Sequence, residues 1–598
     1  MNIRIVLATA MSLSLAMSVV WPSETLHASS ASDPSAGTAA AAVPITIDSN
    51  VPKELNASGG GAQKAVLSQA AAFAWQEFIA LNWPAVNQSG FNGQRDTPNT
   101  KCLFGDPSCD GPLVWETFRS KVEIFPGKGV PPGYVNNPNT SFGYDALPAY
   151  NYDNVVPACG ATSTSTAWVN LDETDQITLD DMYAGAAPTQ VAGNSSPQLI
   201  RFTAKANRTE YAYVANNQWW TAVPGSVAQK TQTYLETNKA SPPPGSSQYV
   251  SLPLNTIEMK AGWRELTTTE QQSGRFHMAK VRSYETNTSK TTCYREAVWG
   301  LVALHIIQKT ATAPHFIYAT FEQADNILRP NGTPLEDENG AIAGALPACR
   351  SDQKAPCPTI PAVTLDDTAT VSPSGLPPEV DLVPASAQYC TPSVGTRPKN
   401  QLYYQNSDGK PGLPAGGFIC VNYRDNAIPN IIVQANKDAH AAMATYANAH
   451  GQNKPSPWAY YKLVNVQFEA VDKDYAGVYK TNDPYTGRNP ASYHLANIVV
   501  ETNRPLQLFS GGLVGSGYTG VNSDYESQFG GTGIHKNMFY GGGAYNMGGC
   551  MGCHGSQGQH ASGDFSVILA NGAVHKPEPP SVPSPSGATE VVRNRTLK

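Results

Sequence analysis

The segment VWGLVALHIIQKT, residues 298–310, is apolar at almost every position along both sides of a two-residue alternation. A strand that is buried on both faces has this composition, whereas a half-exposed strand alternates apolar and polar residues. The segment therefore predicts the central strand of a sheet. His305 is the one histidine inside this apolar run.

Further strands are predicted on either side of the central one. HFIYATFEQ (315–323) follows it after a turn, and LVWETFRSKVEIF (113–125) has the β-branched and aromatic content of a strand. NTIEMKAGWREL (255–266) alternates in character, and RFHMAKVRSYE (275–285) is predicted to pair with it as a hairpin. One face of the alternating segment carries Ile257, Met259, Ala261 and Trp263, and the other carries Glu258, Lys260 and Arg264.

Two helices complete the expected architecture. Residues 62–82 carry a broad apolar face and stop before Pro84, while residues 436–451 are predicted as a second helix that begins at Asn436 and ends at Gly451. The segments KLVNVQFEAV and ANIVVET then predict two more strands. We expect a strand-rich α+β fold in which a twisted antiparallel sheet carries peripheral helices and long loops.

The ends of the chain predict export. A basic start, an apolar run and small residues indicate a Sec-type signal peptide over 1–28, with an uncleaved anchor as the alternative. We expect a flexible linker at 29–60, one large domain at 61–575, which includes a long irregular excursion at 324–430, and a Pro-rich disordered tail at 576–598. No later stretch is apolar enough to span a membrane, so the mature chain is predicted to have no membrane span.

The composition of the chain limits the classes of partner that we expect. Charged residues make up 15% of the chain and the net charge is -7, with no basic run of the kind that binds nucleic acid. Ten cysteines in an exported chain indicate disulfides, the alternative being several free and buried thiols. Close spacing favours three pairs: Cys102–Cys109, Cys349–Cys357 and Cys390–Cys420.

The motif Cys550-Met551-Gly552-Cys553-His554 has the spacing of covalent c-type haem attachment. Two thiols add to the haem vinyl groups, and the adjacent histidine reaches the iron as the proximal ligand. The alternatives are a zinc half-site, a thioredoxin-like redox pair and an ordinary disulfide. A second C-x-x-C is absent from the sequence and no βαβ pattern precedes the motif, so we favour one covalently bound haem c.

The late position of the motif constrains how the haem is enclosed. No methionine follows His554, and much of the remaining chain is the Pro-rich tail, so a small cytochrome fold cannot be built after it. The upstream body must enclose the haem and supply any sixth ligand. The candidates are His305, His535 and Met547, and an open iron without a sixth protein ligand is the alternative. For His305 the competing interpretation is a hydrogen-bonded core histidine.

CMGCHG and the following GDFSVIL resemble a group of exported bacterial monohaem c-type cytochrome-like proteins, most of which have no defined function. FAWQEFIALNWPA (73–85), VWETFRSKVEIF (114–125), EMKAGWREL (258–266) and LANIVVET (495–502) are similar to the same group, as are GLVALHIIQKT and FIYATFEQADN. The resemblance implies Cys550, Cys553 and His554 as haem sites and a body that forms one unit. It implies no substrate.

These features predict a periplasmic monohaem c-type cytochrome that acts in electron transfer or redox chemistry. Its partner would be a redox protein or a small-molecule electron donor or acceptor. The main alternative is a haem enzyme (a peroxidase, oxygenase or small-molecule reductase) with an open distal iron site. There the polar face of 255–266 would line a pocket, although a solvated, ion-paired surface is the simpler interpretation of that face. A haem-based sensor or binding protein is a further alternative.

Overall fold

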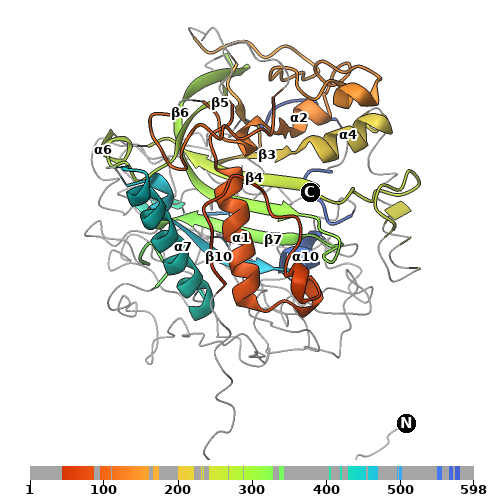
Figure 1. The fold of residues 1–598 in the computed structure, drawn as a ribbon. Coiled ribbons are helices and arrows are strands. Elements are labelled where there is room, and N and C mark those ends of the chain that lie inside the picture. Colours follow the sequence, from red (N-terminus) through yellow and green to blue (C-terminus); the bar gives the residue numbers. More distant parts are fainter. Residues whose placement is uncertain are drawn as a thin grey trace, which may run out of the picture. The chain divides into compact units, whose positions relative to one another are not determined.

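The computed structural model describes the fold in a series of segments. They are residues 43–86, 94–109, 111–160, 166–173, 200–220, 230–231, 234, 237, 242–266, 268–286, 289–326, 336–341, 403–405, 418–420, 428–452, 455–468, 495, 497, 499–500, 549–554, 564–569 and 573–579. Figure 1 draws their helices and strands along the chain. The predicted signal peptide, the cysteines at 349, 357 and 390, and the candidates His535 and Met547 lie outside the described residues.

The central strand is β6 (Thr292–Gln308), which is longer than predicted. Its second half pairs with β4 (Ile257–Arg264) on one side and β7 (Ile317–Gln323) on the other, both antiparallel. The predicted strand after residue 461 is β10 (Tyr461–Gln467), and it extends the sheet beyond β7. The strands predicted at β4, β7 and β10 are therefore confirmed. The doubly apolar β6 lies inside the sheet with a neighbour on each side, as its composition predicts.

The first half of β6 pairs with β5 (Met278–Thr286), so the predicted hairpin between 255–266 and 275–285 is wrong. β5 and β6 are joined by a short turn, and short connections favour pairing with the next strand. The helix α6 (Thr268–Gln272) occupies the connection from β4 to β5 instead.

The sheet is mixed, which corrects the prediction of a purely antiparallel one. β2 (Val169–Leu171) runs parallel to β5, while β3 (Arg201–Ala206) runs antiparallel to β4. A bridge between Glu173 and Phe202 joins the two ends, so these strands form a nearly closed, barrel-like arrangement. A separate pair consists of β8 (Tyr403–Gln405) and β9 (Phe418–Cys420).

Two helices cover one face of the sheet, which we call the core face (Figure 1). α1 (Leu67–Leu81) packs against β10 and against α7 (Asn430–Ala449). Trp75 on α1 meets Phe321 on β7 edge-to-face, with ring centroids 5.1 Å apart, and donates its indole N–H to Asn436. Asn436 thus lies inside α7, where it bonds α1, and it does not begin the helix as predicted.

Residues 113–125 do not form the predicted strand. They form a 3-10 turn at Trp115–Thr117, the two-residue strand β1 (Arg119–Ser120) and the short helix α2 (Lys121–Ile124). Glu123 accepts a hydrogen bond from the backbone N–H of Ser120, which closes a capping box at the start of α2. The aromatic and β-branched content here reflects burial rather than strand geometry.

The folded body begins earlier than predicted, because Ile45 and Leu55 are buried in the core that α1 and the sheet share. The flexible linker predicted over 29–60 is therefore wrong from residue 43 onward. Near the other end, Glu578 donates its backbone N–H to the carbonyl of Asp172, so the start of the predicted tail also packs on the body.

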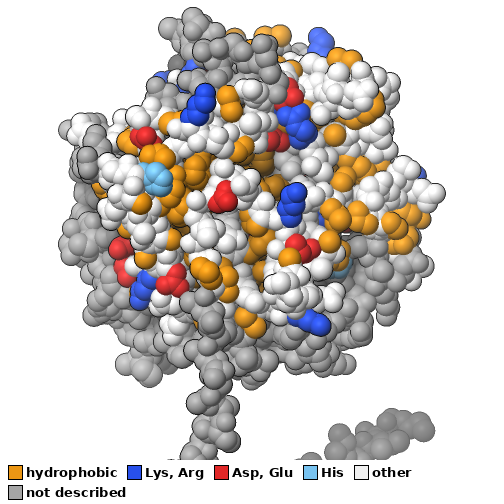
Figure 2. Space-filling view, in the orientation of Figure 1, with side chains coloured by type: hydrophobic (Ala, Val, Ile, Leu, Met, Phe, Trp, Pro, Cys, Tyr) orange, Lys and Arg blue, Asp and Glu red, His pale blue; other side chains and the backbone are white. Residues whose placement is uncertain are grey.

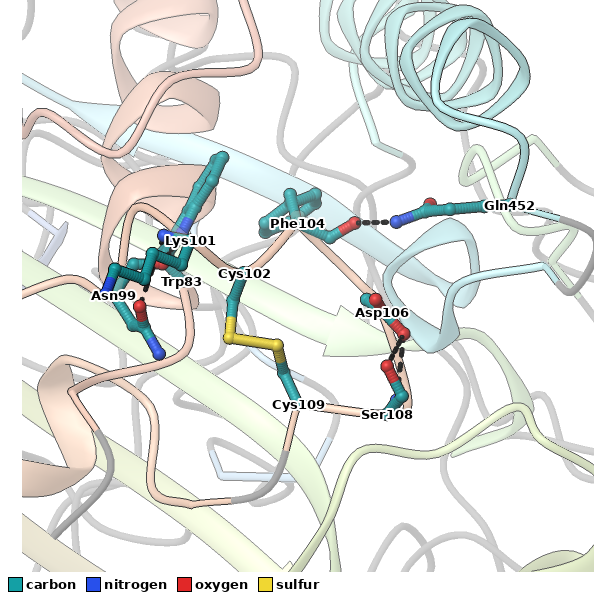
Figure 3. Close-up of a disulfide and its surroundings, with 9 residues drawn as sticks. All are labelled: Trp83, Asn99, Lys101, Cys102, Phe104, Asp106, Ser108, Cys109 and Gln452. Carbon is teal, nitrogen blue, oxygen red and sulfur yellow. Dashed lines mark hydrogen bonds between the residues drawn. A yellow bond between two sulfur atoms is a disulfide. The ribbon is translucent and has the colours of Figure 1, made fainter.

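Two disulfides are present among the described residues. Cys102–Cys109 confirms one predicted pair and closes a loop beside Trp83 and Phe104 (Figure 3). Cys159–Cys293, which was not predicted, joins the loop before β2 to the start of β6. Disulfides persist in oxidising compartments, so this chemistry fits an exported chain. Among the described residues, no helix is both long and apolar enough to cross a bilayer.

Charge is spread thinly over the face of the molecule seen in Figure 2. Lysine and arginine side chains there are scattered singly among aspartate and glutamate, and hydrophobic side chains lie between them. The described part of this face has no large field of one sign.

Candidate functional site

The motif forms the helix α10 (Gly549–His554), which packs against β10. Residues three and four positions apart in a helix lie on one side of it. Cys550 and His554 are four positions apart, and Cys553 lies one turn after Cys550. The backbone therefore places all three motif residues on one side of a single short helix. Cys550 and His554 are each half-buried.

Two contacts hold α10 on the sheet. The backbone N–H of the buried Met551 donates to the side-chain oxygen of Gln467 on β10, with an N···O distance of 3.0 Å. The ring of His554 stacks on that of Tyr318 on β7, with centroids 6.2 Å apart and planes 18° apart. Tyr318 in turn donates its hydroxyl proton to the carbonyl of Phe565. The motif is thus fixed to two neighbouring strands and to the segment that follows it.

These contacts lie on the face of the sheet opposite the core face, which we call the second face. Side chains alternate along strands, and Ala319 and Phe321 belong to the core that α1 covers, so Tyr318 and Thr320 point the other way. The second face carries an unusual number of buried polar side chains. They are Glu258, Arg264, His305, Thr320, Glu322, Asn465 and Gln467.

The prediction that Glu258, Lys260 and Arg264 form a solvated surface is wrong. Glu258 is 0% exposed and Arg264 is 3% exposed, while Lys260 is half-buried. Arg264 pairs with Glu270 of α6, with an N···O distance of 2.6 Å. The alternation showed correctly which residues share a face, but it could not show that chain from elsewhere covers that face.

His305 lies on the second face, two residues along β6 from Ile307, which stands opposite Tyr318. His305 stands directly opposite Lys260 on β4 and Thr320 on β7. Burial, with a smaller effect of the nearby Lys260 charge, lowers the pKa of His305 to about 3, so the ring is neutral at physiological pH. Neutral imidazole is the form that binds iron. The structure therefore brings this candidate to the face that holds α10.

A segment that we call the C-terminal strap, residues 564–569, lies across the same face. Asp564 accepts hydrogen bonds from Lys309 and from the backbone N–H of Leu252, each at 2.6 Å, and the Lys309–Asp564 pair is fully buried. Ser566 and Val567 donate to the two oxygens of Glu258.

The backbone of the strap begins in a strained conformation. Asp564 and Phe565 have φ angles of 47° and 62°, in the left-handed region. That conformation costs roughly 1–2 kcal/mol per residue, and the contacts of Asp564 offset it. The strap is thus held against the second face by buried polar contacts rather than by backbone preference.

The residues present fit a covalently bound haem. Cys550 and Cys553 would supply the thiols for two thioether bonds, and His554 follows directly in the position that the iron ligand would need. The aromatic ring of Tyr318 would offer an apolar contact to the macrocycle, and burial of the second face limits the access of water there. Among the described residues, no group of three or more His, Cys, Asp or Glu side chains has the arrangement of a metal site.

No protein-family model matches the chain, and neither the curated proteins nor the solved structures give a significant match.

Several residues of this site were not predicted from the sequence. They are Tyr318 and Gln467, which contact α10, and Lys309, Asp564 and Glu210, which lie around the strap. One signal was available: polar residues recur at every second position of β7 from 318 to 322, and polar residues also interrupt the apolar β10 at 462, 465 and 467. Polar side chains on a buried strand indicate that this face of the sheet contacts other polar groups or a functional site.

Proposed function

We propose that the chain is an exported c-type cytochrome that carries one haem c and acts in electron transfer or related redox chemistry. Cys550 and Cys553 bind the haem covalently, and His554 is the proximal iron ligand. The observation that carries the proposal is the docked helix α10, in which all three residues lie on one side while Met551 and His554 contact the sheet.

The bound haem supplies an iron that gains and loses one electron. The chain supplies the rest. Gln467 fixes the backbone of α10, so the thiols and the imidazole keep their spacing. Tyr318 sets the plane of the His554 ring, because the two rings stack nearly parallel. The second face and the strap limit the access of water, which affects the redox potential.

His305 is our leading candidate for the sixth ligand, since it is neutral and lies on the second face. His535 and Met547 stay as predictions from the sequence. We place the protein in the periplasm, with a redox protein or a small-molecule electron donor or acceptor as its partner. The two disulfides support an oxidising compartment.

A haem oxidoreductase is the second candidate function. It is favoured by the buried acidic group Glu258, whose pKa is raised to about 7 by burial. Enzymes that move protons at neutral pH use acids tuned in this way. The same group also suits an electron carrier whose potential depends on pH.

The absorption spectrum of the holoprotein, oxidised and reduced, with and without carbon monoxide, separates the two candidates. A low-spin spectrum that carbon monoxide does not change indicates a six-coordinate carrier. A high-spin spectrum that carbon monoxide shifts indicates the enzyme. If His305 is the sixth ligand, His305→Ala is expected to convert the first spectrum into the second, and an unchanged spectrum would exclude this histidine.

Replacing the proximal histidine tests the role of His554. We expect His554→Ala to retain covalently bound haem but to lose the spectrum of the wild-type protein, because the iron loses an axial ligand. The matched control is His450→Ala, since His450 is exposed at the end of α7. Identical spectra for His554→Ala and the wild type would contradict the assignment.

A further inference from the structure

Two glutamates from different elements meet beneath the strap. Glu210 lies on α4 (Arg208–Asn216) and Glu258 lies on β4, and both are 0% exposed. The two carboxyl groups interact electrostatically, and after burial the Glu258 carboxylate is the next cause that raises the pKa of Glu210. Ser566 Oγ donates to one oxygen of Glu258 at 2.5 Å, and the backbone N–H of Val567 donates to the other at 2.6 Å.

This arrangement determines where a proton resides. Two ionised carboxylates that are buried near each other repel, so one of the two groups favours its protonated form. Glu258 receives a donor at each oxygen, as a carboxylate does. Neither carboxyl oxygen of Glu210 accepts a hydrogen bond from a donor in the described part of the chain. Glu210 therefore holds the proton, and the pair carries one negative charge in a fully buried position.

The charged groups around the pair do not prevent it from binding a second proton. Asp564 of the strap faces it, but Lys309 neutralises that carboxylate. Lys260 lies two positions further along β4, and Tyr213 of α4 is bonded to the backbone N–H of Ser251. Burial raises the pKa of Glu258 to about 7 and that of Glu210 well above its ordinary value.

The pair lies close to the proposed redox centre. Glu258, Ile307 and Tyr318 stand directly opposite one another on β4, β6 and β7. Neighbouring strands are about 4.8 Å apart, so Glu258 is roughly 10 Å across the sheet from the tyrosine that stacks on His554. The strap also links them, since Phe565 bonds Tyr318 and Ser566 bonds Glu258.

We propose that the Glu210–Glu258 pair takes up one proton from solvent when the redox centre accepts one electron. The inference rests on the proposed function. The electron comes from an external one-electron donor, and the proton forms an O–H bond on the Glu258 carboxylate. The pair then holds two protons in place of one. The positive charge of the added proton balances the negative charge of the electron on the same face of the sheet.

The coupling has a calculable size. A unit charge about 12 Å away, at an effective dielectric constant of about 20, changes the proton affinity roughly tenfold. Reduction therefore raises the pKa of the pair by about one unit. Because the reduced form binds the proton more tightly, the midpoint potential falls as the pH rises through this window. A tenfold difference in proton affinity corresponds to a total change in midpoint potential of about 59 mV across this window, so the slope reaches about half of 59 mV per pH unit.

The test is a titration of the midpoint potential of the holoprotein from pH 5 to 9. We expect the wild type to show the slope near neutral pH, and Glu258→Gln and Glu210→Gln to lose it. The matched control is Glu77→Gln. Glu77 is equally buried on α1, on the core side of the sheet, and burial keeps it protonated, so this variant should titrate like the wild type.

A milder variant guards against misfolding of the glutamine variants. Ser566→Ala removes one donor from the Glu258 carboxylate, which raises its pKa further, so the sloping window should move to higher pH. An infrared difference spectrum, reduced minus oxidised, should show a new protonated-carboxyl band that is lost in Glu258→Gln. A slope that persists in both glutamine variants of a haem-loaded protein overturns the inference alone. A protein that binds no haem overturns the proposed function.

Discussion

Asp564→Ala is expected to lower the free energy of unfolding by about 3–5 kcal/mol, because it leaves the ammonium group of Lys309 buried without a counter-ion. Both side chains are fully buried, and the N···O distance is 2.6 Å. The variant also removes the acceptor of the Leu252 backbone N–H and the contacts that hold the left-handed backbone of the strap. Chemical denaturation followed by tryptophan fluorescence measures the effect.

The chain offers a matched control for this variant. Asp153 pairs with His575, also near the C-terminus, but these side chains are 46% and 66% exposed. Asp153→Ala should therefore cost at most about 1 kcal/mol. The paired replacement Lys309→Met with Asp564→Leu should recover most of the loss, since it removes the uncompensated charge. A cost of Asp564→Ala no greater than that of Asp153→Ala would contradict a buried ion pair.

Removing the Cys159–Cys293 disulfide is expected to cost about 5 kcal/mol of stability, against about 2.5 kcal/mol for Cys102–Cys109. The cause is the length of chain that each bond constrains in the unfolded state. The two cysteines of the first pair are 134 residues apart in sequence, and those of the second are 7 apart. Alanine pairs at both sites, compared by thermal unfolding under oxidising conditions, measure the difference.

Equal losses at the two sites would show that chain entropy does not dominate. The smaller loop has a second role that would reduce the difference, since it holds Phe104 near Trp83 (Figure 3). The ring of Phe104 also stacks on that of Trp458. The single variant Phe104→Leu measures that contribution separately and leaves the disulfide intact.

The sheet was predictable where the alternation of residues was strong. The residues of β4 that alternate in sequence do occupy opposite faces, and the doubly apolar run became the central β6. The order in which strands pair was harder to predict from the sequence, because it depends on the lengths of the connections. β5 pairs with β6, the strand nearest to it in sequence.

Residues 113–125 show a different limit of the sequence. Their aromatic and β-branched side chains are buried as expected, but the backbone forms short helical turns. Glu123 closes the capping box of α2 and pairs with the buried Arg95 at 2.8 Å. The Arg95–Glu123 contact joins residues 28 positions apart in sequence. Local composition therefore cannot predict it.

For the candidate site, the sequence predicts a chemistry but not the surroundings of the motif. The spacing of Cys550, Cys553 and His554 predicted haem attachment, because that chemistry needs adjacent residues. Tyr318 and Gln467 join the site only through strand pairing, which the motif does not encode. Glu258 was assigned to a solvated face because alternation cannot show that residues 566 and 567, more than 300 positions later, cover it.

The intact mass of the mature chain, expressed with a working haem-maturation system and unfolded in denaturant before measurement, tests the central claim most directly. We expect the mass of the polypeptide plus one haem, which denaturant cannot remove because thioether bonds hold it. The variant Cys550→Ala with Cys553→Ala should show the polypeptide alone, while Cys102→Ala with Cys109→Ala should keep the haem. A wild-type mass without haem would contradict the account.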